Sequence, residues 1–146
     1  MTQKSVFFYS EGSRILGVLH VPKTLKKGRR LAAVVVCYGY CDFMDDPWVV
    51  EICERLNRIG VVALRFDYRG NGASEGLRGR IICSDEVKDV QSAVTFLETK
   101  SEVDEGRIGL VGYSLGGANV SYLSAIDDRV KCTVSIAGVS NGERWL

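Results

Sequence analysis

A serine between two glycines is the feature of this sequence whose residue types could do chemistry. The motif Gly112-Tyr113-Ser114-Leu115-Gly116 follows the apolar run 107–111 and precedes residues 118–125, which favour a helix. A G-x-S-x-G sequence between a strand and a helix is typical of a tight turn that exposes a nucleophilic serine. The glycines allow the strand and the helix to approach closely. The pattern predicts that Ser114 is a nucleophile, and the alternative is an ordinary small residue at a helix start.

The residues that would activate this serine are harder to find. A serine hydroxyl reacts poorly unless a base, usually a histidine oriented by a carboxylate, takes its proton. His20 is the only histidine, and it precedes Ser114, whereas the acid and the histidine follow the serine in hydrolases with this turn. We therefore interpret His20 as structural. Asp127 and Asp128 stand too early for the acid and are interpreted as solvated turn residues.

Length, charge and composition exclude several classes of protein. The 146 residues correspond to one domain, 1–146, and the net charge of +1 gives no case for binding nucleic acid or a membrane. No apolar run approaches the ~20 residues that span a bilayer. The five cysteines include no C-x-x-C pair, so neither a zinc site nor a disulfide framework is expected. We expect a cytoplasmic protein that needs no metal or organic cofactor.

Two groups of residues have plainer interpretations. Four cysteines lie in or beside apolar runs and are predicted to be small core residues, namely Cys37, Cys53, Cys83 and Cys132. Cys41 is expected to be more exposed. The basic residues within 23–30 are interpreted as a solvated loop, and the alternative is a phosphate-binding patch.

The arrangement of apolar runs predicts strands that alternate with helices. Strands are expected at Ser5–Tyr9, Ile15–Val21, Leu31–Cys37, Val61–Phe66, Ile108–Val111 and Cys132–Ile136. One helix is expected from an Asp46 cap to Gly60, and a second from a Ser84 cap, with Asp85 and Glu86 in its first turn. This order predicts a three-layer α/β/α fold around a mostly parallel sheet. Ligands bind such sheets at the carboxyl ends of the strands, where the loops 38–45 and 67–79 should meet the Ser114 turn.

The same strand order bears on His20 and on the glycine-rich loop. The run that His20 ends is expected to be antiparallel to the others, so His20 should lie at the sheet edge opposite Ser114. Asp67, Arg69 and Ser74 are expected to fix the loop 67–79 by side-chain hydrogen bonds rather than to take part in chemistry.

Four stretches resemble the α/β-hydrolase family, in particular the esterase and serine-aminopeptidase-like branch that includes cinnamoyl and feruloyl esterases. They are residues 17–22, 66–76, 107–117 and 128–131. The resemblance implies that the chain corresponds to the N-terminal part of the family's fold, through the strand after the serine. The α/β-hydrolase fold would then be incomplete in these 146 residues. It also implies that about 60 to 100 further residues of the core, with the acid and the histidine, would follow.

The resemblance also implies an oxyanion hole. In the family, a His-Gly-aromatic sequence ends the third strand, and here Tyr38-Gly39-Tyr40 stands in its place. The backbone N–H groups of Tyr40 and Leu115 would be the two donors. A turn after a buried strand is the alternative interpretation of Gly39.

Two functions remain open at this point. The first is a serine hydrolase that cleaves a carboxylic ester or small amide through an acyl-enzyme on Ser114. The second is a non-catalytic protein with a truncated hydrolase fold that binds a ligand or a partner chain. We also expect an unpaired edge at the last strand, which would promote self-association or pairing with a complementary chain.

Overall fold

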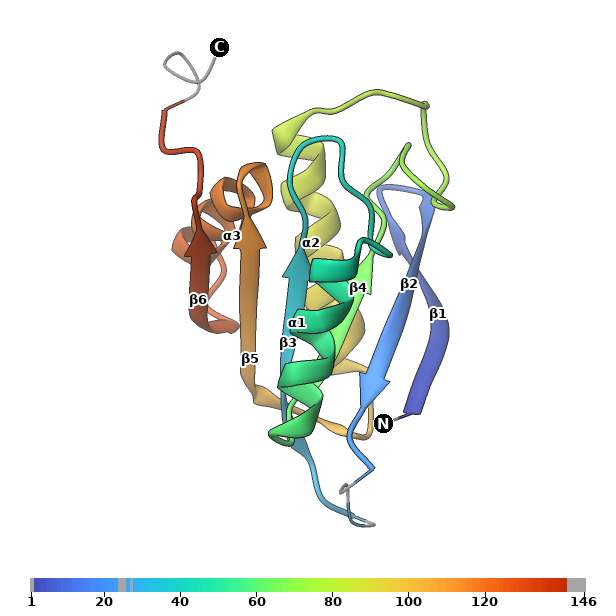
Figure 1. The fold of residues 1–146 in the computed structure, drawn as a ribbon, viewed down its shortest axis with the longest axis vertical. Coiled ribbons are helices and arrows are strands. Elements are labelled where there is room, and N and C mark those ends of the chain that lie inside the picture. Colours follow the sequence, from blue (N-terminus) through green and yellow to red (C-terminus); the bar gives the residue numbers. More distant parts are fainter. Residues whose placement is uncertain (1, 24–25, 27, 142–146) are drawn as a thin grey trace.

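The computed structural model describes residues 2–23, 26 and 28–141. Six strands and three helices follow one another along these residues (Figure 1): β1 (Thr2–Ser10), β2 (Ser13–Val21), β3 (Leu31–Cys37), α1 (Pro47–Arg58), β4 (Val62–Phe66), α2 (Cys83–Glu98), β5 (Val103–Tyr113), α3 (Leu115–Ile126) and β6 (Val130–Ile136). All six predicted strands are present, and β3 has the predicted bounds.

One sheet holds all six strands in the order β1-β2-β4-β3-β5-β6. The strands β4, β3, β5 and β6 are parallel, whereas β2 is antiparallel to both of its neighbours. Helix α1 covers one face of the sheet, and α2 and α3 cover the other (Figure 1). The predicted three-layer α/β/α fold with a mostly parallel sheet is confirmed.

The core lies between the sheet and these helices. Strand β4 is buried along its whole length, and the inner face of α2 buries the predicted residues Val87, Val90, Val94 and Leu97. At the carboxyl ends of β3, β4 and β5, the loop 38–46, the loop 67–82 and the turn at Ser114 lie on the same edge (Figure 1). The convergence expected from topology is therefore present.

Four details of the sequence interpretation are wrong. Helix α2 begins at Cys83, and its N-cap is Ile82, so Ser84 lies inside the first turn and caps nothing. Cys83 and Cys132 are exposed rather than part of the core, because one begins α2 and the other lies on the edge strand β6. Asp127 is buried, not solvated. The other cysteine predictions, buried Cys37 and Cys53 and exposed Cys41, are confirmed.

The basic segment 23–30 is exposed where the structure describes it. The described basic residues of this segment, Lys23, Lys26, Arg29 and Arg30, are exposed, and Lys27 lies outside the described residues. Within the described residues, no helix is both long enough and apolar enough to cross a membrane.

Candidate active site

Ser114 lies between the end of β5 and the start of α3, in the tight turn that the motif predicts. Its φ of 52° and ψ of −116° belong to a region that residues with a side chain rarely adopt. The backbone is held in this conformation by β6, since the Ser114 N–H donates to the Ile136 carbonyl over 2.9 Å. The Ser114 carbonyl accepts from the N–H of Ala118 and of Val139, at 3.2 and 3.3 Å. The turn thus depends on the strand that follows it in the chain.

The glycines of the motif are required by close backbone contacts. A Cβ added at Gly112 would overlap the carbonyl oxygen of Gly116, and one added at Gly116 would overlap the carbonyl of Tyr38. The second would also lie 2.7 Å from the Cys37 carbonyl oxygen. The start of α3 is therefore packed directly against the end of β3, which brings the turn and the loop after β3 together.

The loop 38–46 lies against Ser114. A Cβ added at Gly39 would be only 3.1 Å from the Ser114 Cβ and 3.2 Å from the Tyr113 carbonyl oxygen. The Gly39 N–H is directed to the carboxylate of Asp42, at 3.2 Å. Tyr40, whose backbone N–H is a predicted oxyanion donor, follows Gly39 directly and is half exposed.

Leu115, the second predicted donor residue, is the first residue of α3. Its side chain is buried, and Ser114 is the N-cap of this helix. The N–H groups in the first turn of a helix have no carbonyl partner within the helix, and the helix dipole adds positive potential there. The structure thus places Ser114, Leu115 and the residue before Tyr40 in one contact region.

Tyr38 occupies the position where the resembled family has histidine. Its side chain is buried, and its hydroxyl accepts a hydrogen bond of 2.9 Å from the Tyr68 N–H. Burial, together with the nearby charge of Asp67, raises the pKa of the Tyr38 hydroxyl above its ordinary value. The tyrosine therefore stays neutral and links the loop 38–46 to the residues after β4.

The glycine-rich loop is fixed largely as expected. The Asp67 carboxylate accepts from the N–H of Met44 at 3.0 Å and of Ala73 at 3.2 Å. The Ser74 hydroxyl donates to the Asp67 carbonyl over 2.6 Å. Arg69 acts farther away, because its guanidinium pairs with the buried Asp89 of α2 at 2.7 Å. All three side chains therefore have structural roles.

His20 lies on the side of the sheet away from Ser114. It pairs in register with Ala63 near the start of β4, whereas Ser114 follows the carboxyl end of β5. Its side chain is fully buried, and its Nε2 accepts from Arg65 Nε over 3.0 Å. Burial and the Arg65 charge lower the pKa of His20 to about 4. The predicted position of His20 at the opposite edge is therefore confirmed, and its burial and its bond to Arg65 support a structural role.

A buried carboxyl on α2 was missed by sequence reasoning. The sequence placed Glu86 in the first turn of α2, as observed, but gave it no role; in the structure it is buried and accepts a 2.6 Å hydrogen bond from Asn119 of α3. Burial raises the pKa of Glu86 to about 7, while the Asn119 hydrogen bond opposes that shift. The available signal was the position of Glu86 directly before Val87, at the border of the apolar face of α2.

Replacing Glu86 with glutamine is expected to stabilise the protein at pH 8 and to have little effect at pH 5. The folded state holds the carboxyl proton more tightly than the unfolded chain, so stability falls as pH rises from about 4.5 to about 7. Glutamine keeps the acceptor for Asn119 without the charge. We expect a gain of about 3 kcal/mol at pH 8 by urea unfolding, since one pKa unit corresponds to about 1.4 kcal/mol. Equal effects at both pH values, or the same effect in the exposed control Glu105→Gln, would contradict this prediction.

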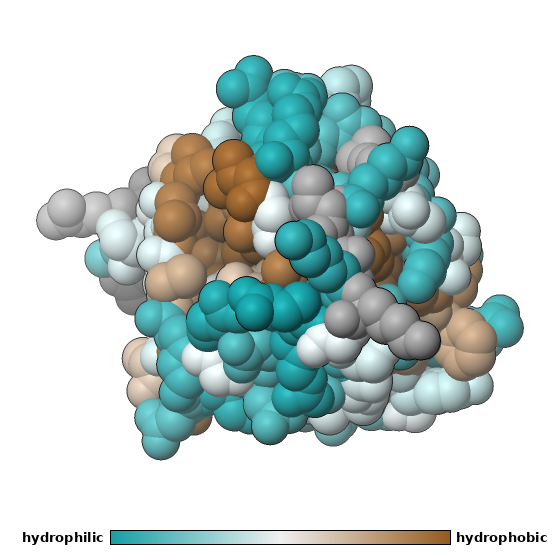
Figure 2. All heavy atoms as spheres, turned by 90° about the horizontal axis from the view of Figure 1, so that it is seen from below, coloured by the Kyte–Doolittle hydropathy of each residue, from teal (hydrophilic) through white to brown (hydrophobic). Residues whose placement is uncertain are grey.

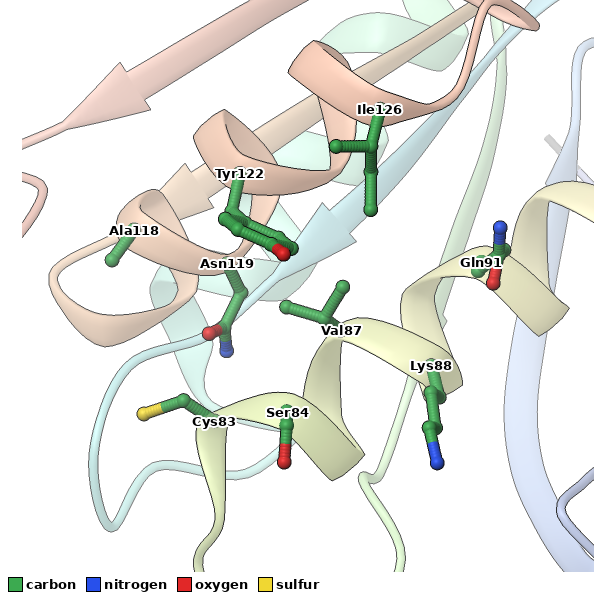
Figure 3. A pocket seen from close by; sticks show the side chains of 9 residues that line it. All are labelled: Cys83, Ser84, Val87, Lys88, Gln91, Ala118, Asn119, Tyr122 and Ile126. Atoms are coloured by element: carbon green, nitrogen blue, oxygen red, sulfur yellow. The ribbon is translucent and has the colours of Figure 1, made fainter.

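A groove of about 530 Å³ lies between α2 and α3 (Figure 3). Val87 of α2 and Tyr122 and Ile126 of α3 provide most of its apolar wall, and Asn119 lies at one end near Cys83. Its lining does not include Ser114, Tyr40 or Leu115. We therefore place the candidate active site at the sheet edge and not in this groove.

In the part of the chain that the structure describes, no group of three or more histidine, cysteine, aspartate or glutamate side chains could hold a metal ion.

The strand order, the helices on both faces and the serine turn after the fifth strand define an α/β-hydrolase fold. The family model for serine aminopeptidase, S33, matches residues 28–142 of this sequence. The chain belongs to this family of α/β hydrolases, as the sequence motifs predicted.

Two curated relatives illustrate the match. The thiohydrolase apmlB of Arthrinium phaeospermum is 39% identical over 137 residues, which are 93% of this chain and 43% of that protein. An uncharacterized 31.7 kDa protein of Escherichia coli, from a traX-finO intergenic region, is 36% identical over 112 residues, covering 75% and 38%. The chain thus spans about two fifths of the length of these relatives.

Solved structures agree with the fold. The α/β hydrolase GrgF from Penicillium sp. sh18 superposes with a TM-score of 0.87 and 26% identity, over 94% of this chain and 46% of that one. Est1E from Butyrivibrio proteoclasticus, solved with ferulic acid bound, gives a TM-score of 0.83 at 22% identity, over 91% and 52%. The second likeness concerns the fold alone.

Proposed function

We propose that Ser114 is the nucleophile of a serine hydrolase that cleaves a carboxylic ester or small amide. The observation that carries the proposal is the strained strand–serine–helix turn, with Gly39 packed against Ser114. The hydroxyl would attack the substrate carbonyl, break the ester C–O or amide C–N bond with release of the alcohol or amine, and form an acyl-enzyme from which water releases the acid. The relative named a thiohydrolase adds thioesters to the substrate classes to be tested.

In this proposal, the backbone N–H groups of Tyr40 and Leu115 bind the oxyanion of the tetrahedral intermediate. Three features support it: the dipole of α3 points at the turn, Gly39 contacts Ser114, and the Gly39 N–H is directed to Asp42. Donors that are fixed before the reaction stabilise developing charge without reorganisation. Neither a metal nor an organic cofactor takes part in this mechanism.

The rival function is a non-catalytic hydrolase-fold protein that binds a ligand or another chain. One observation favours it: the only histidine in the sequence is buried, bonded to Arg65 and remote from Ser114. The 146 residues therefore contain no histidine that could act as the base.

Hydrolysis of a p-nitrophenyl ester by the 146-residue chain is expected to be feeble and independent of His20. Without a base, only the oxyanion hole and binding remain, which retain about 10³- to 10⁴-fold acceleration over water in serine proteases. The variant is His20→Gln, because glutamine keeps an acceptor for Arg65 but cannot serve as a base. The protein encoded by the whole reading frame that contains residues 1–146, called the whole-frame protein below, is assayed in parallel.

The comparison separates the two functions. Higher turnover by the whole-frame protein than by the short chain supports the hydrolase. Equal and feeble rates in both support the binding protein. Robust turnover by the short chain that is lost in His20→Gln would show that His20 acts as the base and that its interpretation as a purely structural residue is wrong.

We also propose that β6 is an association edge. Strand β6 pairs only with β5 among the described strands, and its Val134 and Ile136 are 52% and 40% exposed. Seen from below, apolar residues gather at the left of the molecule, which is the side of β6 in Figure 1 (Figure 2). Such edges recruit partner strands or aggregate. We expect light scattering to show self-association of the 146-residue chain, and a monomer with a sharp cooperative melt would contradict this.

A further inference from the structure

An arginine in the middle of a buried strand is the least expected residue near the candidate site. Arg65 lies in β4, where every residue is buried, and its side chain is only 6% exposed. Burying a charged guanidinium is costly unless its N–H groups are hydrogen-bonded. The partners of Arg65 therefore indicate why the fold retains it.

One side of the guanidinium is held by the sheet. Arg65 Nε donates to His20 Nε2 of β2 over 3.0 Å, and the lowered pKa keeps His20 neutral and able to accept. The other His20 nitrogen, Nδ1, is buried and has no hydrogen-bond partner among the described residues. The arginine is thus the one hydrogen-bond partner that this imidazole has in the described structure.

The other side reaches into the loop 38–46. Arg65 Nη1 donates to the Met44 carbonyl over 2.9 Å and also to the carboxylate of Asp45. The Met44 N–H donates in turn to Asp67, so both backbone groups of Met44 are tied to β4 and the residue after it. Asp45 itself is 72% exposed and does not need a cation to offset burial.

These contacts fix the loop 38–46 at Met44, near its C-terminal end. The N-terminal end of the same loop lies against Ser114. Gly39 packs on Ser114, Met44 is held by Arg65 and Asp67, and Tyr40 lies between the two fixed points. We propose that Arg65, oriented by His20, is a positioning residue that holds the loop 38–46 and thereby aims the Tyr40 N–H at the reacting carbonyl. The inference rests on the proposed function, because it assigns Arg65 to that same site.

The test replaces Arg65 and measures both loop opening and catalysis in the whole-frame protein. In Arg65→Met, we expect the amides of residues 40–45 to exchange about 10-fold faster with deuterium, while those of β3 and β5 are unchanged. We expect kcat for a p-nitrophenyl ester to fall about 10-fold or more with KM within twofold, because a misplaced oxyanion donor weakens only the transition state. Arg65→Lys should recover part of kcat.

Two further variants make the result decisive. Arg55→Met removes an exposed arginine of α1 and should change neither loop exchange nor kcat. The double variant His20→Leu, Arg65→Met replaces the whole buried pair with apolar groups, and it serves where the single variant does not fold.

The two readouts have separate meanings. Unchanged exchange of residues 40–45 in a folded Arg65→Met or double variant would overturn the positioning role. Faster exchange with an unchanged kcat would also overturn it. A wild-type protein without Ser114-dependent turnover would instead overturn the proposed function, and loop exchange would still decide whether Arg65 holds the loop.

Discussion

Replacing Ser114 with alanine in the whole-frame protein is expected to lower kcat for ester hydrolysis by about 10⁴-fold or more. The hydroxyl is the only group in the turn between β5 and α3 that can form the covalent intermediate of the proposed mechanism. The proposed oxyanion donors beside it are the backbone N–H groups of Leu115 and of Tyr40 in the loop 38–46. The substitution leaves these groups in place. Activity should therefore fall without loss of the fold.

The control for this variant is Ser121→Ala. Ser121 is an exposed residue of the same helix α3 whose hydroxyl bonds to the Gly117 carbonyl. It should retain full activity. Turnover near the wild-type level in a purified, folded Ser114→Ala protein would contradict the assignment of the nucleophile.

Replacing Gly116 with alanine is expected to lower the free energy of unfolding by about 3 kcal/mol or more. The added Cβ would meet the carbonyl groups of Tyr38 and Cys37, and backbone atoms cannot rotate away as a side chain can. Helix α3 would have to move away from β3, which would separate the serine turn from the loop 38–46. Urea unfolding measures the loss.

Gly106→Ala is the matched control. Gly106 lies in the same strand, β5, as the start of the motif, but an added Cβ there would meet only the Asp104 carboxylate at an ordinary 3.4 Å. Its stability should stay close to that of the wild type. Equal effects of the two substitutions would show that the contact between α3 and β3 does not require glycine.

The local patterns predicted the architecture well because they report burial and turn chemistry directly. The β-branched run Leu31–Cys37 became β3 with the expected bounds, and Gly60 follows α1 with a φ of 86°. Strand β5 is longer than its apolar run because Val103 pairs with Leu31 across a register shift. That extension comes from pairing between distant segments, which no local pattern records.

Residues of the candidate site could be proposed from the sequence only where a motif marks them. The motif around Ser114 carries its own backbone constraints, so the turn could be placed from sequence. The roles of Arg65 and Glu86 depend on partners far along the chain, His20 and Asn119. A charged residue inside an apolar run was the visible signal for Arg65, but only the packed structure identifies the loop it reaches.

The most direct measurement is to map the covalent adduct formed with a fluorophosphonate on the whole-frame protein. Such a probe forms a stable phosphonyl ester with an activated serine, and peptide mass spectrometry locates it. The proposed function predicts one adduct per chain, on the peptide that contains Ser114, and none in Ser114→Ala. An adduct on another residue, or no adduct on a folded protein that hydrolyses the ester, would contradict it.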